Sequence, residues 1–481
     1  MSEQQREERK LQRGEGLRPS THEPELLPKP RRRLAERGLD ERVQRKGIPF
    51  KPGEPVDQSP PTAPSPTAPG ERGEVVFETY TPVTPPRGVL QPPDPTGADG
   101  ERDVVLMLGN SYLSVSTDGG GSFTDVDPTA FLPAAVGRAV DQVMTYVPHR
   151  DLFAWMMQHG TDGSGDGTFR LAVAAAKDVA ADVKTAWTVW DFTSSMFGAP
   201  KTATDRQDLA FDESHLYLTT NLVGKGRIVV SLSLQELAAG GALGYGYTDP
   251  LDAMYQFSCL SQQNPSNVYS VAIKDASTLQ AMFFDDGAGV YSFHDITVGQ
   301  FPTATDLSSK DPDGIDWLTR GVANVSASVV RGDDLWIAWD AAASGSGDSP
   351  TFKNAHVRLA RVDRTSWTRL EERQVWNDDY AFAYGCLAIG PNGDVGYGVA
   401  VGGSSDYPNS CFGILGDYVV YFRDTSTATA GAGSEPRWGD YITVRPSVRD
   451  GRRFAAFGYF TVKASGGGET QSPYFLSYGR P

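Results

Sequence analysis

The chain has 481 residues, 39% of them hydrophobic, and a formal net charge of −16 at neutral pH. This length accommodates several small domains or one large repeat domain. The negative charge argues against nucleic acid as a ligand, because phosphates would be repelled, and no apolar run approaches the roughly 20 residues that a membrane helix needs.

Residues 1–53 differ from the rest of the chain in charge. They contain 14 Lys and Arg against 9 Asp and Glu, so this segment is basic while the remainder is strongly acidic. One short helix is predicted at about 32–46, with too few apolar positions to form a core. We predict a basic arm that docks onto a protein partner, with a disordered tail as the alternative. The candidate docking residues are Arg31, Arg32, Arg33, Arg37, Arg42, Arg45 and Lys46.

The arm is followed by a segment of different composition. Residues 54–73, EPVDQSPPTAPSPTAPGERG, are rich in Pro, Ser and Thr, which predicts an extended linker. The beginning of the chain, MSEQQREERKLQRGEG, has no apolar stretch that could act as a secretory signal. We therefore expect a cytoplasmic protein, or one exported by a route that does not read such a signal.

From residue 74 to residue 481, a pattern of strand, polar turn and strand recurs, with large apolar residues alternating in the second strand. Short helical segments are expected only at 171–183 and 233–242, so alternating strands and helices are disfavoured. The pattern occurs at 103–123, 141–157, 207–221, 254–273, 326–340, 386–401 and 441–460.

The spacing of roughly 40 to 70 residues is typical of β-propeller blades. We count seven units and predict a seven-bladed antiparallel β-propeller with an extended N-terminal arm; six blades are the alternative. The strand at 74–82 has no hairpin partner, whereas the last unit, from Asp440 onward, is short of a strand. We expect these two segments to share one blade and close the ring, because an open ring would leave unpaired edges.

The stretch STDGGGSF, residues 116–123, joins two strands of the first hairpin region. Its residues Ser116, Asp118, Gly120 and Phe123 resemble the Asp-box, the repeat of bacterial neuraminidases that is found in sialidase-like β-propellers. Asp118 can accept hydrogen bonds across the turn, and Gly120 can take a positive φ. The resemblance implies a structural turn away from the catalytic face, with Phe123 buried between sheets.

The same resemblance implies what a catalytic member would need. A sialidase carries three arginines for the substrate carboxylate, a Tyr–Glu nucleophile pair, an acid Asp and an Arg-Ile-Pro strand. No Arg-Ile-Pro tripeptide occurs in this sequence, and only one well-formed Asp-box is present. We therefore assign no catalytic residue, and we expect no three arginines to converge in the channel mouth beside a Tyr–Glu pair.

Several polar residues begin the innermost strand of successive units, where they would surround the top of the channel. The segment WGDY, residues 438–441, looks like a motif of uncharacterised bacterial Asp-box propellers and places one of these residues. Carboxylates around one axis repel each other unless a cation, water or a partner offsets the charge. The ring is therefore either a site for a cation such as calcium or for a polar ligand, or a set of strand caps. Its members are Asp141, Asp208 (or Asp205), Asp252, Asn324 and Asp440.

The cysteines Cys259, Cys386 and Cys411 show no zinc-ligand or disulfide spacing, so we assign no cofactor. The favoured function is a non-enzymatic recognition or structural module, attached through its arm to a larger assembly and able to take a carbohydrate at the channel face. One alternative is a sialidase-like glycoside hydrolase. The other is cargo or a component of a phage or contractile injection particle, which rests on analogy.

Overall fold

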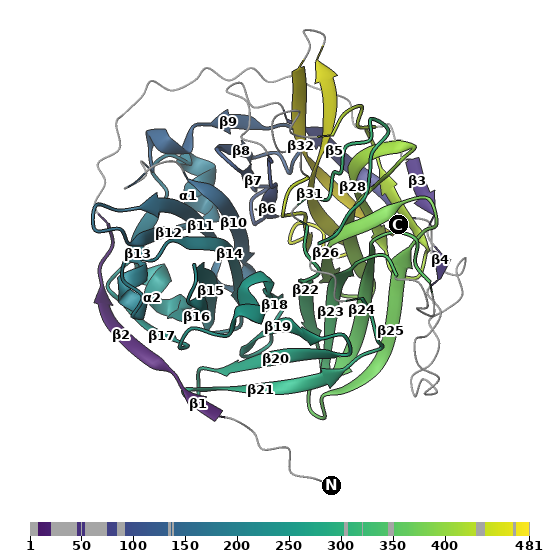
Figure 1. Ribbon diagram of the computed structural model, residues 1–481. Helices are drawn as coiled ribbons and strands as arrows, with labels where there is room; N and C mark the ends of the chain where they lie inside the picture. Colours follow the sequence, from purple (N-terminus) through teal and green to yellow (C-terminus); the bar gives the residue numbers. More distant parts are fainter. Residues whose placement is uncertain are drawn as a thin grey trace.

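The computed structural model describes residues 8–20, 46–49, 51–52, 75–83, 92–132, 136, 139–302, 306–319, 321–344, 351–429, 438–464 and 468–480. In these residues β-strands predominate, and curled antiparallel sheets stand around a common centre (Figure 1). This all-β arrangement is a β-propeller.

Most strands of the propeller body pair with the strands that come before and after them in the sequence. They are β6 (Thr96–Asp99), β7 (Val105–Gly109), β8 (Tyr112–Ser116), β9 (Thr124–Val126), β10 (Val140–Val147), β11 (Leu152–Thr161), β12 (Gly167–Ala175), β13 (Thr188–Thr193), β14 (Thr204–Phe211), β15 (His215–Leu222), β16 (Gly226–Ser233), β17 (Leu243–Tyr247), β18 (Cys259–Gln262), β19 (Val268–Asp275), β20 (Thr278–Asp285), β21 (Val290–Thr297), β22 (Val325–Arg331), β23 (Asp334–Ala341), β24 (His356–Asp363), β25 (Thr368–Trp376), β26 (Ala381–Ile389), β27 (Val395–Gly403), β28 (Asp406–Ile414), β29 (Val419–Phe422), β30 (Thr443–Pro446), β31 (Arg453–Ala464) and β32 (Gly468–Gly479).

Helices are short and lie between strands. The two α-helices, α1 (Ala176–Asp182) and α2 (Leu234–Ala239), fall within the two segments where the sequence predicts helical turns. The described residues also form four 3₁₀ turns: η1 (Pro128–Ala130), η2 (Pro148–Arg150), η3 (Ser194–Phe197) and η4 (Ala253–Phe257). Among the described residues, no helix has the length and apolar character needed to cross a membrane.

The N-terminal part of the chain supplies five further strands. They are β1 (Glu8–Lys10), β2 (Gln12–Leu17), β3 (Lys46–Pro49), β4 (Lys51–Pro52) and β5 (Val76–Pro82). Strand β5 pairs antiparallel with β32, so the order of that sheet is β30-β31-β32-β5. The prediction that 74–82 joins the last sheet and closes the ring is therefore confirmed by the pairing.

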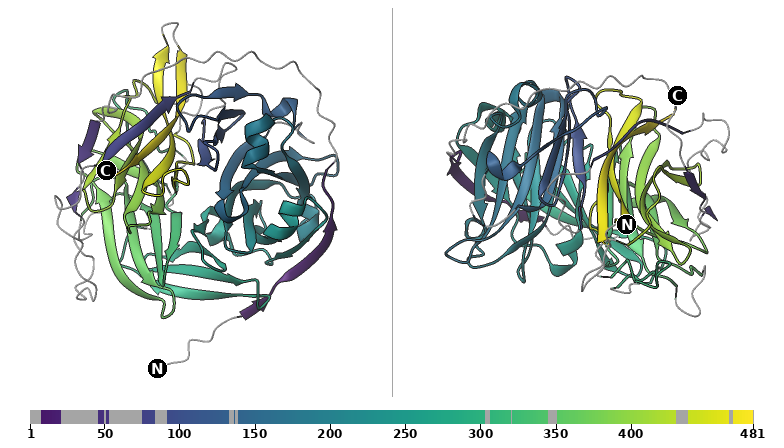
Figure 2. Two further views of the ribbon diagram at one scale, coloured as in Figure 1. Left: turned by 180° about the vertical axis from the view of Figure 1, so that it is seen from behind. Right: turned by 90° about the horizontal axis from the view of Figure 1, so that it is seen from above.

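Strands β1 to β4 extend the outer edges of other sheets, which the sequence analysis did not predict. Their partners are β21, β17, β29 and β25, respectively. In the two opposite views of Figures 1 and 2 these strands lie along the outside of the ring. The segments ERK and QRGEGL lack alternating apolar residues, so their pairing depends on the open edges that the body presents.

The core consists of apolar layers between neighbouring sheets. Five tryptophans are essentially inaccessible to solvent: Trp155, Trp190, Trp317, Trp339 and Trp438. One such layer joins Trp317 and Trp438, whose rings meet edge to face at 6.3 Å, to residues of β5, β26 and β31. These rigid layers fix the positions of the innermost strands, which line the centre of the ring.

Candidate functional site

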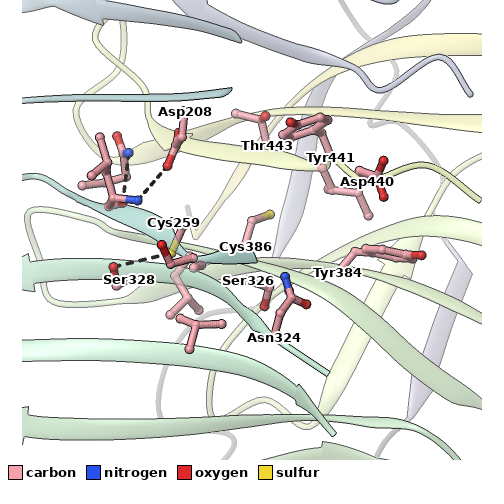
Figure 3. Close-up of a pocket in the computed structure, with 18 of the residues that line it drawn as sticks. Asp208, Cys259, Asn324, Ser326, Ser328, Tyr384, Cys386, Asp440, Tyr441 and Thr443 are labelled. Carbon is pink, nitrogen blue, oxygen red and sulfur yellow. Dashed lines mark hydrogen bonds between the residues drawn. The ribbon is translucent and has the colours of Figure 1, made fainter. Parts of the chain in front are cut away.

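A central cavity of about 120 Å³ lies where the first strands of neighbouring sheet segments meet. Strands β14, β18, β22, β26 and β30 supply most of its lining, and Figure 3 shows their side chains around it. Phe257 and Ser258 join the lining from the segment before β18. The cavity is therefore assembled from parts of the chain that are far apart in sequence.

Bulges in two of these strands turn side chains toward the cavity. The register of β14 against β15 shifts between Asp205 and Asp208, and that of β26 against β27 shifts between Ala383 and Cys386. Within the bulges, Arg206 has φ 51° and Tyr384 has φ 57°. Large side chains adopt such a backbone only where their surroundings enforce it, and this strain often marks functional sites.

Three of the five residues of the predicted channel ring line the cavity: Asp208, Asn324 and Asp440. The other two do not. Asp141 lies in a bulge of β10 and its backbone N–H donates to Asn110 Oδ1 at 2.8 Å, while Asp252 precedes η4 and makes no side-chain capping bond. Asp141 nevertheless lies within electrostatic reach of two lining residues, Arg206 and Tyr441. Three of the five residues thus belong to the lining, and the five-residue ring stays a prediction.

The alternative residue, Asp205, is also outside the lining. The described part of the chain holds no group of three His, Cys, Asp or Glu side chains placed to bind a metal ion. The Asp208 carboxylate instead accepts the backbone N–H groups of Leu209 and Leu260, each at 2.8 Å. Asp440 Oδ1 lies 4.0 Å from Arg206 Nη1. Protein groups therefore offset these two carboxylates.

Asp340, at the end of β23, is a cavity residue that the sequence analysis missed. It is 1% exposed; its Oδ2 accepts the backbone N–H of Tyr384 at 3.1 Å, and the Gly385 N–H also interacts with the carboxyl, while no hydrogen bond of good geometry reaches Oδ1. Burial raises the pKa of Asp340 to about 7, and burial also raises the pKa of Asp208. Asp340 is thus the lining carboxyl that combines a raised pKa with an unpaired buried oxygen.

Gln207 is a second residue that was missed. It is fully buried in the bulge of β14, lines the same cavity, and has no hydrogen-bond partner at either amide atom, Nε2 or Oε1. The backbone carbonyl oxygen of Gln207, by contrast, accepts a hydrogen bond from the Tyr441 hydroxyl at 3.5 Å. The sequence RQDLAF gives no sign that this glutamine is buried, because the burial depends on the bulge.

Three arginines line the cavity: Arg206, Arg227 and Arg445. The expectation concerned three arginines in the channel mouth beside a Tyr–Glu pair, and no glutamate occurs among the described lining residues. Arg227 Nη1 donates to Asn221 Oδ1 at 2.8 Å and to two backbone carbonyls, and Arg445 Nη2 donates to the Met144 carbonyl at 2.6 Å. These guanidinium groups tie inner strands together.

An exposed aromatic ring stands at the cavity. Phe257 is 39% exposed, and the Arg206 guanidinium carbon lies 5.0 Å from the centre of its ring. The Phe257 ring is thus held by a cation–π contact. A largely apolar concave site with an aromatic ring and a few convergent polar groups is typical of ligand sites.

Two thiols also belong to the lining, Cys259 and Cys386. Burial raises the pKa of each thiol to about 12. At neutral pH both are protonated, and a thiol is a poor nucleophile compared with its thiolate. They give the cavity no nucleophilic chemistry.

The stretch 116–123 forms the loop between β8 and β9, outside the central cavity. Asp118 Oδ1 accepts the Ser116 hydroxyl at 2.6 Å and the Ser122 N–H at 2.9 Å, and Asp118 Oδ2 accepts the Ser122 hydroxyl at 2.6 Å. Gly120 has φ 85°, and a Cβ there would lie 2.2 Å from the Phe475 ring of the adjoining sheet. Phe123 packs on the same ring at 6.0 Å. The loop is thus a tight turn that contacts its neighbouring sheet.

Asp118→Ala should lower the free energy of unfolding by about 2 kcal/mol, because it removes three hydrogen bonds worth about 0.5–1.5 kcal/mol each. Denaturant unfolding measures this loss. Asp252→Ala is the matched control, since that carboxylate makes no capping bond, and it should unfold like the unchanged protein. Equal stability of the Asp118→Ala protein would contradict the structural role of the turn.

Of the candidate docking residues, Lys46 alone is described. It begins β3, opposite Phe422 of β29; its Nζ donates to Thr425 Oγ1 at 2.6 Å and lies 5.9 Å from the centre of the Phe422 ring. The other six, the helix expected at 32–46 apart from its last residue, and the linker 54–73 lie outside the described residues.

No protein-family model matches the chain, and no characterised protein matches its sequence significantly. Solved structures with a similar chain path include a chain of the mitotic checkpoint complex (10% identity, 87% of this chain and 97% of that chain, TM-score 0.42). They also include the α-L-arabinofuranosidase Arb93A from Fusarium graminearum (8%, 84% and 98%, TM-score 0.34) and the Trypanosoma rangeli sialidase (10%, 72% and 54%, TM-score 0.36). At these values the likeness concerns the fold and carries nothing about activity.

Proposed function

We propose that this protein is a non-enzymatic recognition module whose central cavity holds a small neutral ligand rich in hydroxyl groups, such as one carbohydrate unit. The observation that carries the proposal is that Gln207 and Asp340 both belong to the lining of one cavity. Three of their polar atoms, Gln207 Nε2 and Oε1 and Asp340 Oδ1, are buried without a partner. Such burial costs about 1–3 kcal/mol per group, and a ligand hydroxyl that bonds these atoms would recover part of that free energy.

The pattern of donors and acceptors favours hydroxyl groups. The Gln207 amide offers one donor and one acceptor site, and a hydroxyl can satisfy both types. Asp340, with a pKa raised to about 7, can accept or donate near neutrality. The volume of about 120 Å³ is small beside the 300–1,000 Å³ typical of drug-sized ligands. A single sugar unit resting on Phe257 suits this space better than an oligosaccharide.

The charges around the cavity favour a neutral ligand. Arg206 faces Asp440, and Arg227 and Arg445 donate to carbonyl groups. A carboxylate ligand would have to compete with Asp440 for Arg206 and would meet Asp208 as well. Bidentate recognition of an anion needs a free guanidinium fork, and all three guanidinium nitrogens of Arg445 already donate to protein acceptors.

The alternative of a glycoside hydrolase has one observation in its favour. Asp340, with its raised pKa, has the property of a general acid. Hydrolysis also needs a second carboxylate that can act as nucleophile or base. Asp208 is occupied by two backbone N–H groups and Asp440 lies beside Arg206. We therefore favour binding without turnover.

The architecture that we propose has seven blades. The described strands form six sheets, and the ten-stranded sheet contains one parallel pairing, of β18 with β22. When that sheet is divided at this pairing, the body strands fall into seven groups of four. Attachment to a larger assembly through residues 1–53 also stays a proposal, as does membership of the Asp-box superfamily. Because β1 to β4 pair with the propeller, a partner would have to bind while these strands stay paired, or it would have to displace them from the sheet edges. A role as a particle component has no observation of its own.

Two assays test the proposal together. In thermal unfolding with D-glucose, D-galactose, D-xylose or L-arabinose at about 50 mM, at least one sugar should raise the melting temperature, since a ligand at 100 times its Kd adds about 2.7 kcal/mol. Fluorogenic glycosides of the same sugars, and of sialic acid, should show no turnover. Turnover that disappears in Asp340→Asn would make the protein a hydrolase. No shift with any sugar would exclude the proposed ligand class.

A further inference from the structure

Residues 8–20, which we call the N-terminal belt, run along the outer edges of three consecutive sheet segments. Strand β1 pairs with β21, strand β2 pairs with β17, and the Ser20 N–H donates to the Val189 carbonyl of β13 at 2.7 Å. The Ser20 hydroxyl adds a bond to Asp191 Oδ2 at 2.6 Å. The belt thus covers main-chain groups that an outer strand would otherwise leave open to other chains.

Side chains give the belt a single register. Leu11 is 9% exposed and packs in the apolar layer that contains Tyr217 and Tyr255. A Cβ at Gly14 would lie 2.1 Å from the Tyr245 ring, so the ring takes the space of a missing side chain. Arg9 stands over the Phe293 ring at 5.1 Å. The three edges therefore recognise this particular segment.

Charged groups add one bridge across the sheets under the belt. Arg13 Nη1 lies 3.6 Å from Asp286 Oδ1, and Asp286 Oδ2 lies 3.1 Å from His215 Nε2. Most other belt residues are exposed along β1 and β2. An edge segment with few buried side chains opens more readily than the sheets beneath it.

We propose that the belt is exchangeable, so that the belt of one copy docks on the β13, β17 and β21 edges of a second copy and joins the two chains. The contacts would be the same in both arrangements, as in domain swapping. Twenty-five residues separate Ser20 from Lys46, and a chain of that length spans up to about 90 Å. The connection is therefore long enough for the belt to reach a neighbour. This inference is independent of the proposed ligand.

Concentration should govern the choice between the two arrangements. A belt on its own chain competes at an effective concentration of about 1 mM, the order of magnitude found for two binding segments that are linked in one chain. Copies at micromolar concentration should therefore keep their own belts. Copies near millimolar concentration should exchange them.

The test uses two full-length proteins, Arg13→Cys as donor and Gly246→Cys as acceptor, because these residues face each other across β2 and β17. After co-incubation at about 0.5 mM and oxidation, a non-reducing gel should show a donor–acceptor dimer, which diminishes at least fivefold at about 5 µM. Gly451→Cys, an open position away from the belt, is the control acceptor and should form few dimers. Equal dimers with both acceptors, or none with either, would overturn the exchange.

A second variant guards against a misfolded donor or acceptor. The single chain Arg13→Cys/Gly246→Cys should cross-link within itself at about 5 µM, which shows that both positions tolerate cysteine. Adding Gly14→Val to the donor should remove the dimer, since its side chain collides with Tyr245. A dimer that persists with Gly14→Val would show that the link does not come from belt docking.

Discussion

Gln207→Leu should raise the free energy of unfolding by about 1–2 kcal/mol while it abolishes sugar binding in the central cavity. Leu has nearly the volume of Gln, and it replaces two buried amide atoms that have no partner in the described structure. Removing an unsatisfied buried polar group without leaving a cavity stabilises a protein. Denaturant unfolding measures the first effect, and sugar-dependent melting measures the second.

Gln471 in β32 offers a matched control. It is 4% exposed, and neither of its amide atoms has a hydrogen-bond partner, but it does not line the cavity. Gln471→Leu should therefore stabilise the protein to a similar extent and leave sugar binding intact. A loss of stability in Gln207→Leu would mean that the Gln207 amide is satisfied within the protein, against its assignment to a ligand.

Two buried histidines, His159 in β11 and His356 in β24, should make a destabilising contribution when the pH falls from 7 to 5. It opposes the stabilising contribution of the buried carboxyls whose pKa is raised, Asp340, Asp208 and Asp99. Burial lowers the pKa of His159 to about 4 and that of His356 to about 3, and neither ring has a hydrogen-bond partner. Both pKa values lie below the usual 6.5, so below pH 6.5 the unfolded chain binds more protons than the folded one. Stability is therefore lost as the pH falls from about 6.5 toward the folded-state pKa, by about 2 kcal/mol per histidine at pH 5.

His356→Leu isolates this effect. The Phe352 ring stacks on His356 at 3.9 Å, so an apolar replacement fits its surroundings. The difference in stability between pH 7 and pH 5 should shrink by about 2 kcal/mol in His356→Leu and stay the same in His149→Gln, whose ring is exposed. The raised pKa of Asp340 acts in the opposite direction, and it cancels in this comparison. An unaltered pH dependence in His356→Leu would show that His356 is not the neutral buried group described above.

Local patterns in the sequence predict the fold well. Alternating apolar residues around polar turns indicate the hairpins, because each strand needs one face for the core. The unpaired strand at 74–82 and the incomplete last unit together predict ring closure, which the pairing of β5 with β32 bears out. The loop 116–123 also shows the bonds that its Asp and Gly spacing predicts.

The site is predicted only in part, since non-local geometry decides it. Asp208, Asn324 and Asp440 are found from their positions at strand starts, but the bulge at Arg206 brings in Gln207, and the neighbouring strand end brings in Asp340. Neither feature has a sequence signal. The belt is missed for a similar reason: QRGEGL has no strand pattern, and its structure comes from the edge of β17.

Titration calorimetry with the sugar that most raises the melting temperature tests the central claim most directly. The account predicts one binding site per chain in the unchanged protein and in Gln471→Leu. It also predicts at least a tenfold weaker affinity in Gln207→Leu, because one lost hydrogen-bonding group is worth about 1.4 kcal/mol or more. Equal affinity in Gln207→Leu and Gln471→Leu would contradict the assignment of the central cavity as the binding site.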